Sequence, residues 1–284
     1  MTDELLRPFR DKIRGRTPAH KASEASPPGH EEQVPADAIL IRDVRLGLFP
    51  EVSCLHPGFV PGIARVRLTI DLGVHMRGRP APLDAGGREA LLELCPRLPD
   101  HDCGAGDEIR LLFAGGGAGG AGVRTSFDDG NERDGLPVAH LIEHVAIEMI
   151  VSVSGVPRCS GVTCAHRDRV DRFDIFLECV DPLAGRAVAI LAAAVVRDLC
   201  LRRAGRLPLH RRCRDLIAHL SCSGAATQVA EDTARNLGCG QDEAVQALEE
   251  LVRLGYLTAA PSPYLFSSTS GVLFRRAAVD VPGA

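Results

Sequence analysis

No stretch of this sequence is apolar over the length that a membrane-spanning helix needs, about 18 residues or more. The longest apolar segment, residues 182–201, is interrupted by Arg186, Arg197 and Asp198, and it is predicted to be a helix packed on a sheet. The amino terminus carries charges throughout and has no apolar signal core. The sequence therefore predicts a cytoplasmic protein without a membrane partner.

Nucleotide-binding signatures are also missing. The chain has no G-x-x-x-x-G-K-[ST] phosphate loop, which argues against ATP use by this chain alone. Residues 115–120 fit G-x-G-x-x-G in form, but a polar stretch follows them where a dinucleotide site needs a helix. We interpret these glycines as a flexible loop.

Neither charge nor cysteine spacing points to a special class. The formal net charge is −4, which gives no reason to expect nucleic acid or an anionic membrane as a partner. The ten cysteines are scattered, unlike the disulfide framework of a small secreted domain. One local cluster, Cys159 and Cys164 with His166 close behind, has no second pair to complete a structural zinc site and predicts free thiols. A cysteine nucleophile in this cluster is a rival mechanism, but the sequence offers no orienting third group.

The residues that carry chemistry are His140, Glu143 and His144, in the order H-x-x-E-H. Residues four apart on a helix lie one turn above each other, so the two imidazoles are expected to point the same way. This spacing suits two histidines that bind one zinc ion, and it puts Glu143 where it could take a proton from an activated water. The order of the motif is that of the inverzincin peptidases.

An amphipathic helix is predicted to carry this motif. It starts after Pro137, with Asp134 as a capping side chain, and stops at Gly155 and Pro157. Apolar residues gather on its other side: Val138, Leu141, Ile142, Val145 and Met149. The alternative is an ordinary amphipathic helix whose polar face meets solvent.

A catalytic zinc ion usually has three protein ligands, so a third is expected. The favoured candidate is Glu178, in the predicted strand 173–180. Alternation puts Ile175 and Leu177 on one face of this strand and Phe176 and Glu178 on the other, so Glu178 lies among apolar residues and needs a positive partner. A zinc ion would be such a partner, and so would a neighbouring arginine. The second candidate is Glu148, one helical turn beyond His144.

Several segments resemble, in order, the amino-terminal domain of cyanophycin synthetases, over residues 39–203. The most specific part is residues 140–148, and the others are residues 41–46, 66–73, 91–96, 101–103, 177–178 and 185–187. The resemblance implies a domain that accompanies ATP-grasp and Mur-ligase-like modules, for which this chain has no room. The two modules build an arginine-decorated polyaspartate, and in some members the amino-terminal domain carries a zinc-dependent site that cuts this polymer. The resemblance implies His140 and His144 as the zinc ligands and Glu143 as the base.

The sequence departs from that family around the motif. It has no tryptophan. Residues 134–137 stand where family members usually have a Gly-Thr-Trp-like segment before the helix, and residues 157–164 stand where they have a glycine-rich turn after it. The metal motif is kept while its surroundings differ, which favours related chemistry on another substrate.

Three regions are predicted along the chain. Residues 1–38 are polar and proline-containing and are expected to be disordered. Residues 39–204 alternate strand-like and helix-like runs, and residues 65–72 show the period-two alternation of a strand. This mixture predicts an α+β domain with helices packed on a mostly antiparallel sheet. Residues 205–284 read as three helices and a hairpin, typical of a winged-helix module. Its third helix is acidic, which opposes DNA binding and favours docking or a homodimer.

We therefore expect a zinc-dependent hydrolase that cleaves an amide or peptide bond, including an isopeptide bond, in a small peptide or a peptide conjugate made by a separate ligase. One alternative is a non-catalytic domain that holds a peptide for a separate ATP-grasp ligase in trans. Another is a winged-helix regulator with a ligand-sensing front domain.

Overall fold

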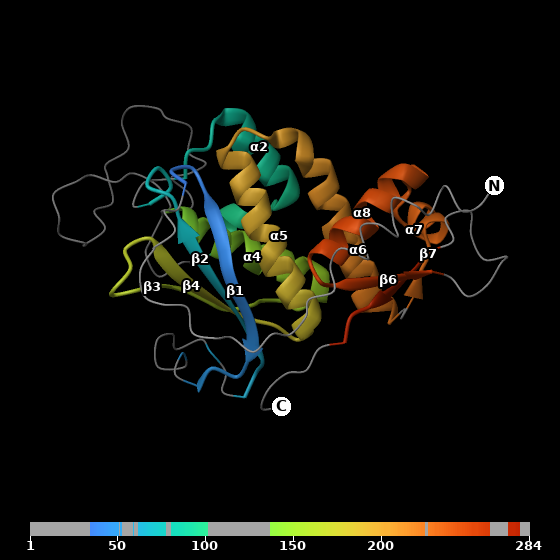
Figure 1. Cartoon of the computed structure of the whole chain (residues 1–284), viewed down its shortest axis with the longest axis horizontal. Helices are drawn as coiled ribbons and strands as arrows, with labels where there is room; N and C mark the ends of the chain where they lie inside the picture. Colours follow the sequence, from blue (N-terminus) through green and yellow to red (C-terminus); the bar gives the residue numbers. More distant parts are fainter. Residues whose placement is uncertain are drawn as a thin grey trace, which may run out of the picture. The chain divides into compact units, whose positions relative to one another are not determined.

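The structure is a computed structural model that describes residues 35–50, 52, 59, 62–77, 81–101, 137–224, 227–261 and 272–278 (Figure 1). Most of the predicted disordered segment, the glycine-rich residues 115–120 and Asp134 lie outside the described residues. Within the described residues, no helix has both the length and the apolar character needed to cross a membrane.

Four antiparallel strands form the main sheet. Their spatial order is β1 (Ile39–Gly47), β2 (Arg65–Leu72), β4 (Arg172–Glu178) and β3 (Gly161–Ala165). The strand predicted from period-two alternation is β2, a central strand whose side chains are nearly all buried. The α+β class predicted from the sequence is confirmed.

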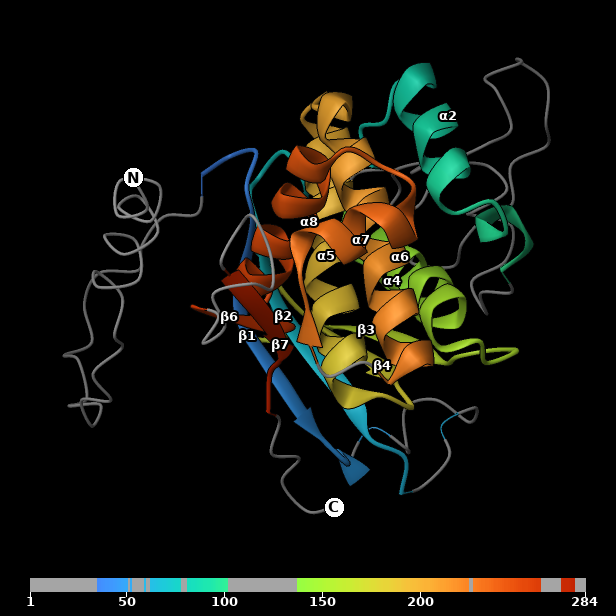
Figure 2. The ribbon, with the colours of Figure 1, turned by 90° about the vertical axis from the view of Figure 1, so that its right-hand side faces the viewer.

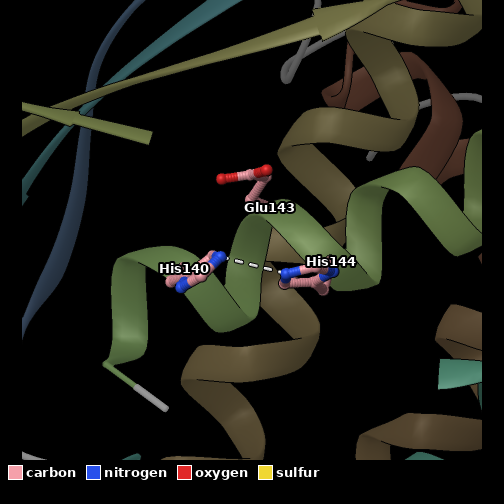
Figure 3. Close-up of side chains that lie close together, drawn as sticks. All are labelled: His140, Glu143 and His144. Carbon is pink, nitrogen blue, oxygen red and sulfur yellow. Dashed lines mark hydrogen bonds between the residues drawn. The ribbon is translucent and has the colours of Figure 1, made fainter. Parts of the chain in front are cut away.

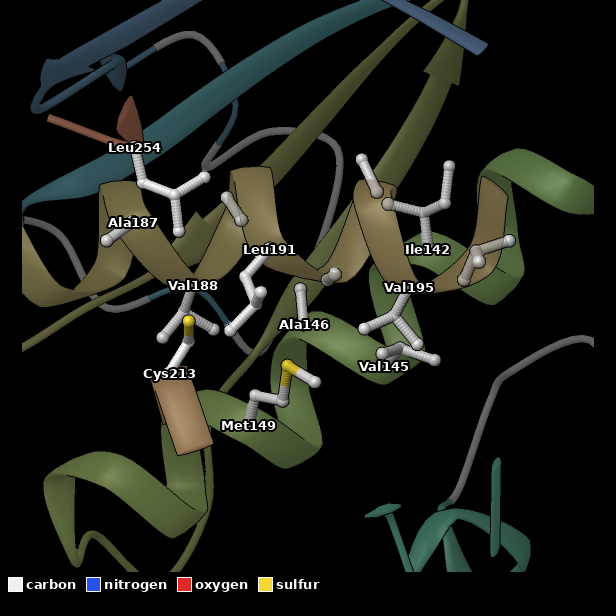
Figure 4. Packing of buried hydrophobic residues seen from close by; sticks show 14 of the residues in the cluster. Ile142, Val145, Ala146, Met149, Ala187, Val188, Leu191, Val195, Cys213 and Leu254 are labelled. Carbon is white, nitrogen blue, oxygen red and sulfur yellow. The ribbon is translucent and has the colours of Figure 1, made fainter. Parts of the chain in front are cut away.

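Two long helices, α4 (Val138–Ser154) and α5 (Pro182–Cys200), pack against each other and against the sheet (Figures 1 and 2). Figure 4 shows their contact, where Leu191 and Val195 of α5 lie beside Val145, Ala146 and Met149 of α4. Gly185 allows α5 to approach the strands closely, because a Cβ there would lie 2.6 Å from the Cβ of Cys179. Any larger residue at position 185 would push the helix away from the sheet.

The opposite face of the sheet carries a smaller apolar cluster. Phe176 of β4 is buried there with Val52 and Phe59, whereas its neighbours Ile175 and Leu177 belong to the main core. Successive side chains of a strand point to opposite faces, which explains this division. The sheet therefore separates a helix-covered face from a second, thinly covered one.

Helix α2 (Ala85–Leu94) and the short helix η2 (Leu98–Asp100) precede α4 along the chain, and η2 contacts α4. Asp84 caps α2 by accepting a hydrogen bond from the backbone N–H of Gly87, at 2.7 Å. Leu98 of η2 is fully buried, so the residue after the short helix, His101, is held near α4.

In the part of the chain that the structure describes, α5 and the short helix η3 (Ala204–Arg206) are followed by three α-helices and three short strands. They are α6 (Leu207–Ser223), β5 (Thr227–Gln228), α7 (Ala230–Leu237), α8 (Gln241–Arg253), β6 (Leu257–Pro261) and β7 (Val272–Arg276). The strands form a sheet in the order β5-β7-β6. These are the predicted helices and hairpin with one added strand, and the winged-helix assignment stays a prediction.

The regions on the two sides of residue 205 share one hydrophobic core. Cys213 of α6 and Leu254 after α8 lie in the same buried cluster as Met149 of α4 and Val188 of α5 (Figure 4). Arg276 of β7 also forms an ion pair with Asp181 at the start of α5, at 2.6 Å. The two predicted regions are thus packed together as one compact unit.

Candidate metal centre

Helix α4 has the ends that its sequence predicts. Pro137 precedes its first residue, and Gly155 ends it with φ +65, a left-handed conformation that favours glycine. Its polar face, however, is largely shielded from solvent: Glu143, His144 and Glu148 are only 5%, 3% and 6% exposed, and His140 is half-buried. The alternative of an ordinary helix with a solvated polar face is therefore wrong.

His140, Glu143 and His144 form one group of side chains that could hold a metal ion (Figure 3). Their nitrogen and oxygen donor atoms all lie within 4.8 Å of one another. The Nε2 atoms of His140 and His144 face each other at 3.0 Å. Among the described residues this is the only such group, and it is the one that the H-x-x-E-H spacing predicts.

The protonation of these side chains follows from their burial. Burial, helped by the neighbouring His140 and His101, lowers the pKa of His144 to about 3. Burial also lowers the pKa of His140. Both imidazoles are therefore neutral near pH 7, the form in which histidine binds metal ions.

Burial has the opposite effect on the carboxyl group of Glu143. It raises the pKa of Glu143 to about 7, while a hydrogen bond from Thr163 acts against the rise. A carboxyl group of this kind can take up and release a proton near neutral pH.

Strand β3 holds Glu143 from the side of the sheet. The hydroxyl of Thr163 donates to Oε2 of Glu143 at 2.6 Å. A Cβ on Gly161 would lie 3.0 Å from both Cγ and Oε1 of Glu143, so glycine leaves the room that this side chain occupies. The two strand residues thus orient the carboxylate, and neither was singled out from the sequence.

Glu178, the favoured third ligand, does not join this group. It ends β4 and forms an ion pair with the buried Arg65, with Nη2 and Oε1 3.3 Å apart. Strand alternation puts Glu178 on the same face as Phe176, whereas Thr163, which contacts α4, pairs with Ile175 of the other face. In the structure the positive partner of Glu178 is therefore an arginine, which was the alternative to a zinc ion.

Glu148, the second candidate, also lies outside the group, although it is on the same helix. Its Oε1 accepts from the backbone N–H of Arg97 at 3.2 Å, and its Oε2 contacts Nε2 of His101 at 2.9 Å. The other ring nitrogen of His101, Nδ1, contacts Nδ1 of His144 at 3.2 Å. From the sequence, His101 was noted only as part of the family resemblance, because no helical or strand spacing connects it with the H-x-x-E-H motif.

Cys159 and Cys164 are free cysteines and are not in the metal group. Burial is the largest cause that raises the pKa of each thiol, and nearby carboxylates add to it. His166 instead contacts Asp174, with Nε2 and Oδ2 3.2 Å apart. A thiol nucleophile needs a lowered pKa, so the cysteine mechanism gains no support from this site.

The chain matches no protein-family model and no curated protein.

Proposed function

We propose that the protein is a zinc-dependent hydrolase that cleaves an amide or peptide bond. The observation that carries the proposal is the buried group of two facing imidazoles and one carboxylate on α4. Imidazole nitrogen and carboxylate oxygen are donors that zinc prefers in proteins. Two neutral histidines whose Nε2 atoms lie 3.0 Å apart suit a shared cation.

In this proposal His140 and His144 hold the ion, which supplies Lewis acidity toward water and the substrate carbonyl when bound. Glu143 takes the proton of the attacking water and returns it to the leaving amine. In the metal-free chain its pKa is about 7, so this carboxyl group can both take up and release a proton near neutral pH. Thr163 keeps one carboxylate oxygen in place, so that the other is directed to the reacting atoms.

The substrate class follows from the resemblance to the amino-terminal domain of cyanophycin synthetases and from the departures around the motif. We propose a small peptide or a peptide conjugate, with a separate ligase as the source of an isopeptide bond. The neutral-to-acidic charge of the chain supports neither nucleic acid nor an anionic surface as the substrate.

The first experiment measures zinc per chain by elemental analysis in the purified protein and in three variants. We expect about one zinc ion per chain. His140→Ala should lose it, Glu143→Gln should keep it, and the control His75→Ala should behave as the wild type, because His75 is an exposed histidine that pairs with Asp37. Protein that stays metal-free after incubation with zinc would contradict the proposal.

Activity is then followed as the release of amines from a library of peptides and isopeptides. With a substrate in hand, Glu143→Gln should lower the rate by about 10²–10⁴, because it removes the general base. A variant that keeps both zinc and activity would show that Glu143 is not the base.

A second function, a non-catalytic domain that holds a peptide for a separate ligase, is favoured by one observation. The carboxylate of Glu143 lies within the ligand group itself, so it could complete a structural metal site together with the two histidines. In that case Glu143→Gln would weaken zinc binding as strongly as His140→Ala. The zinc content of this one variant therefore separates the two functions.

A further inference from the structure

A chain of contacts connects three residues beside the metal group. It runs from Glu148 to His101 and from His101 to His144, at 2.9 and 3.2 Å. All three residues are largely buried, since the side chain of His101 is 15% exposed and Glu148 and His144 are 6% and 3% exposed. Water is thus a weak competitor for these hydrogen bonds.

The direction of each hydrogen bond follows from the chemistry of the groups. An ionised carboxylate only accepts, and both oxygens of Glu148 do so, one from Arg97 N–H and one from His101. His101 therefore donates from Nε2. In its neutral form, an imidazole that donates from Nε2 accepts at Nδ1, so a neutral His101 accepts at Nδ1. Its partner, Nδ1 of His144, must then carry the proton.

We infer that His101, held by Glu148, is a positioning residue that fixes His144 in the Nδ1–H tautomer. The Nε2 lone pair of His144 is thereby directed at His140 and the metal position. This role rests on the proposed function, because the orientation of His144 serves a purpose only when His144 binds a metal ion. The inference also gives Glu148 a role, which is to hold His101 in place beside the ligand His144.

The second ring nitrogen of a metal-binding histidine usually donates to a carboxylate or a carbonyl, and losing that partner costs about 10–100-fold in metal affinity. Here a histidine stands between the ligand and the carboxylate. Because His101 follows η2, 43 residues before His144 along the chain, it also ties the segment after α2 to the site.

The test compares two substitutions of His101 in the full-length protein. His101→Asn keeps an acceptor, because its Oδ1 occupies the place of Nδ1 on the γ-carbon, whereas His101→Leu fills the space without one. We expect zinc affinity, measured by competition with a chromophoric chelator, to fall about 10–100-fold in His101→Leu and to stay close to wild type in His101→Asn. His75→Leu, which breaks an exposed histidine–aspartate pair, is the matched control and should change nothing.

The tautomer itself is measured by ¹⁵N NMR of histidine-labelled, metal-free protein, with His144→Gln for assignment. We expect the Nδ1–H form of His144 in the wild type and its loss in His101→Leu. The opposite tautomer in the wild type would overturn the inference. Equal weakening of zinc binding by Leu and Asn would also overturn it, since that indicates packing rather than hydrogen bonding.

These outcomes separate the inference from the proposed function. A wild-type protein with the Nδ1–H tautomer that binds no zinc would contradict the hydrolase and support the action of His101 on His144. A zinc-binding wild type whose affinity does not change in His101→Leu would contradict the inference alone.

Discussion

The hydroxyl of Thr163 on β3 donates a hydrogen bond to Oε2 of Glu143 on α4, with the oxygens 2.6 Å apart. This bond connects the edge strand of the main sheet to the proposed catalytic base. It also counteracts the effect of burial on the pKa of Glu143. The position of the base is therefore set by the sheet as well as by its own helix.

Thr163→Val removes this donor while keeping the shape of the side chain. We expect the pKa of Glu143 to rise above about 7, because the hydrogen bond that lowers it is gone. The free energy of unfolding at pH 8 should fall by about 1–2 kcal/mol, since the buried carboxylate loses a partner. Carbon NMR titration of the glutamate carboxyl groups and urea unfolding measure the two effects in metal-free protein.

The matched control is Thr69→Val, which removes a hydrogen bond of the same kind to Asp174, also at 2.6 Å, on the same sheet. It should lower stability but leave the pKa of Glu143 unchanged. An unchanged pKa in Thr163→Val as well would show that this hydrogen bond does not control Glu143.

Glu178→Gln separates the ion pair from a ligand role. Because Glu178 pairs with the buried Arg65, we expect about 1–3 kcal/mol of destabilisation. Zinc per chain should stay at the wild-type value, as elemental analysis will show. Loss of zinc in this variant, with the fold intact by circular dichroism, would restore Glu178 as the third ligand.

Gly161→Ala tests the space around the base. The new Cβ would lie 2.9 Å from Cδ1 of Ile147 and 3.0 Å from Glu143, so the side chains of α4 must move. We expect a loss of about 1–3 kcal/mol from overpacking, together with weaker zinc binding. The comparison is Gly205→Ala, where nothing lies within 4 Å of the added Cβ and neither property should change. Equal losses of stability and of zinc binding in both variants would show that crowding against Glu143 and Ile147 is not the cause.

Asp71 makes the fold sensitive to acid. Its fully buried side chain accepts hydrogen bonds from Arg172 and Arg42, and the hydrogen bond from Arg172 is the largest cause that lowers its pKa from 3.8 to about 2. The group is more acidic in the folded chain, so its contribution is present above pH 3.8 and disappears as the pH falls toward 2. That contribution is about 2 kcal/mol.

Urea unfolding of the wild type and of Asp71→Asn should therefore differ most near neutral pH, and the difference should shrink as the pH approaches 2. Asp43→Asn, on the neighbouring strand, is the control, because Asp43 is 37% exposed and its ion pairs contribute little. A difference between wild type and Asp71→Asn that is the same at every pH would exclude this mechanism.

Helical periodicity and strand alternation were enough to predict much of the site. The stop of α4 at Gly155, the bounds of β2 and the meeting of His140 with His144 follow from interactions between residues a few positions apart. A histidine pair four residues apart on a helix is close in space whatever the rest of the chain does. For the same reason, the alternation of β4 correctly separated Ile175 and Leu177 from Phe176 and Glu178.

The alternation of β4 could not show which face of the sheet α4 covers. The structure puts α4 on the face opposite to Glu178, so Glu178 lies outside the metal group. The proximity of His101 to His144, the hydrogen bond from Thr163 and the burial that shifts the pKa of Glu143 also depend on tertiary packing. The sequence by itself determined the pair of candidate metal ligands, His140 and His144, because local backbone geometry acts over one helical turn. Only the tertiary structure decided the partners of that pair, because sheet register and helix packing join residues that no local period relates.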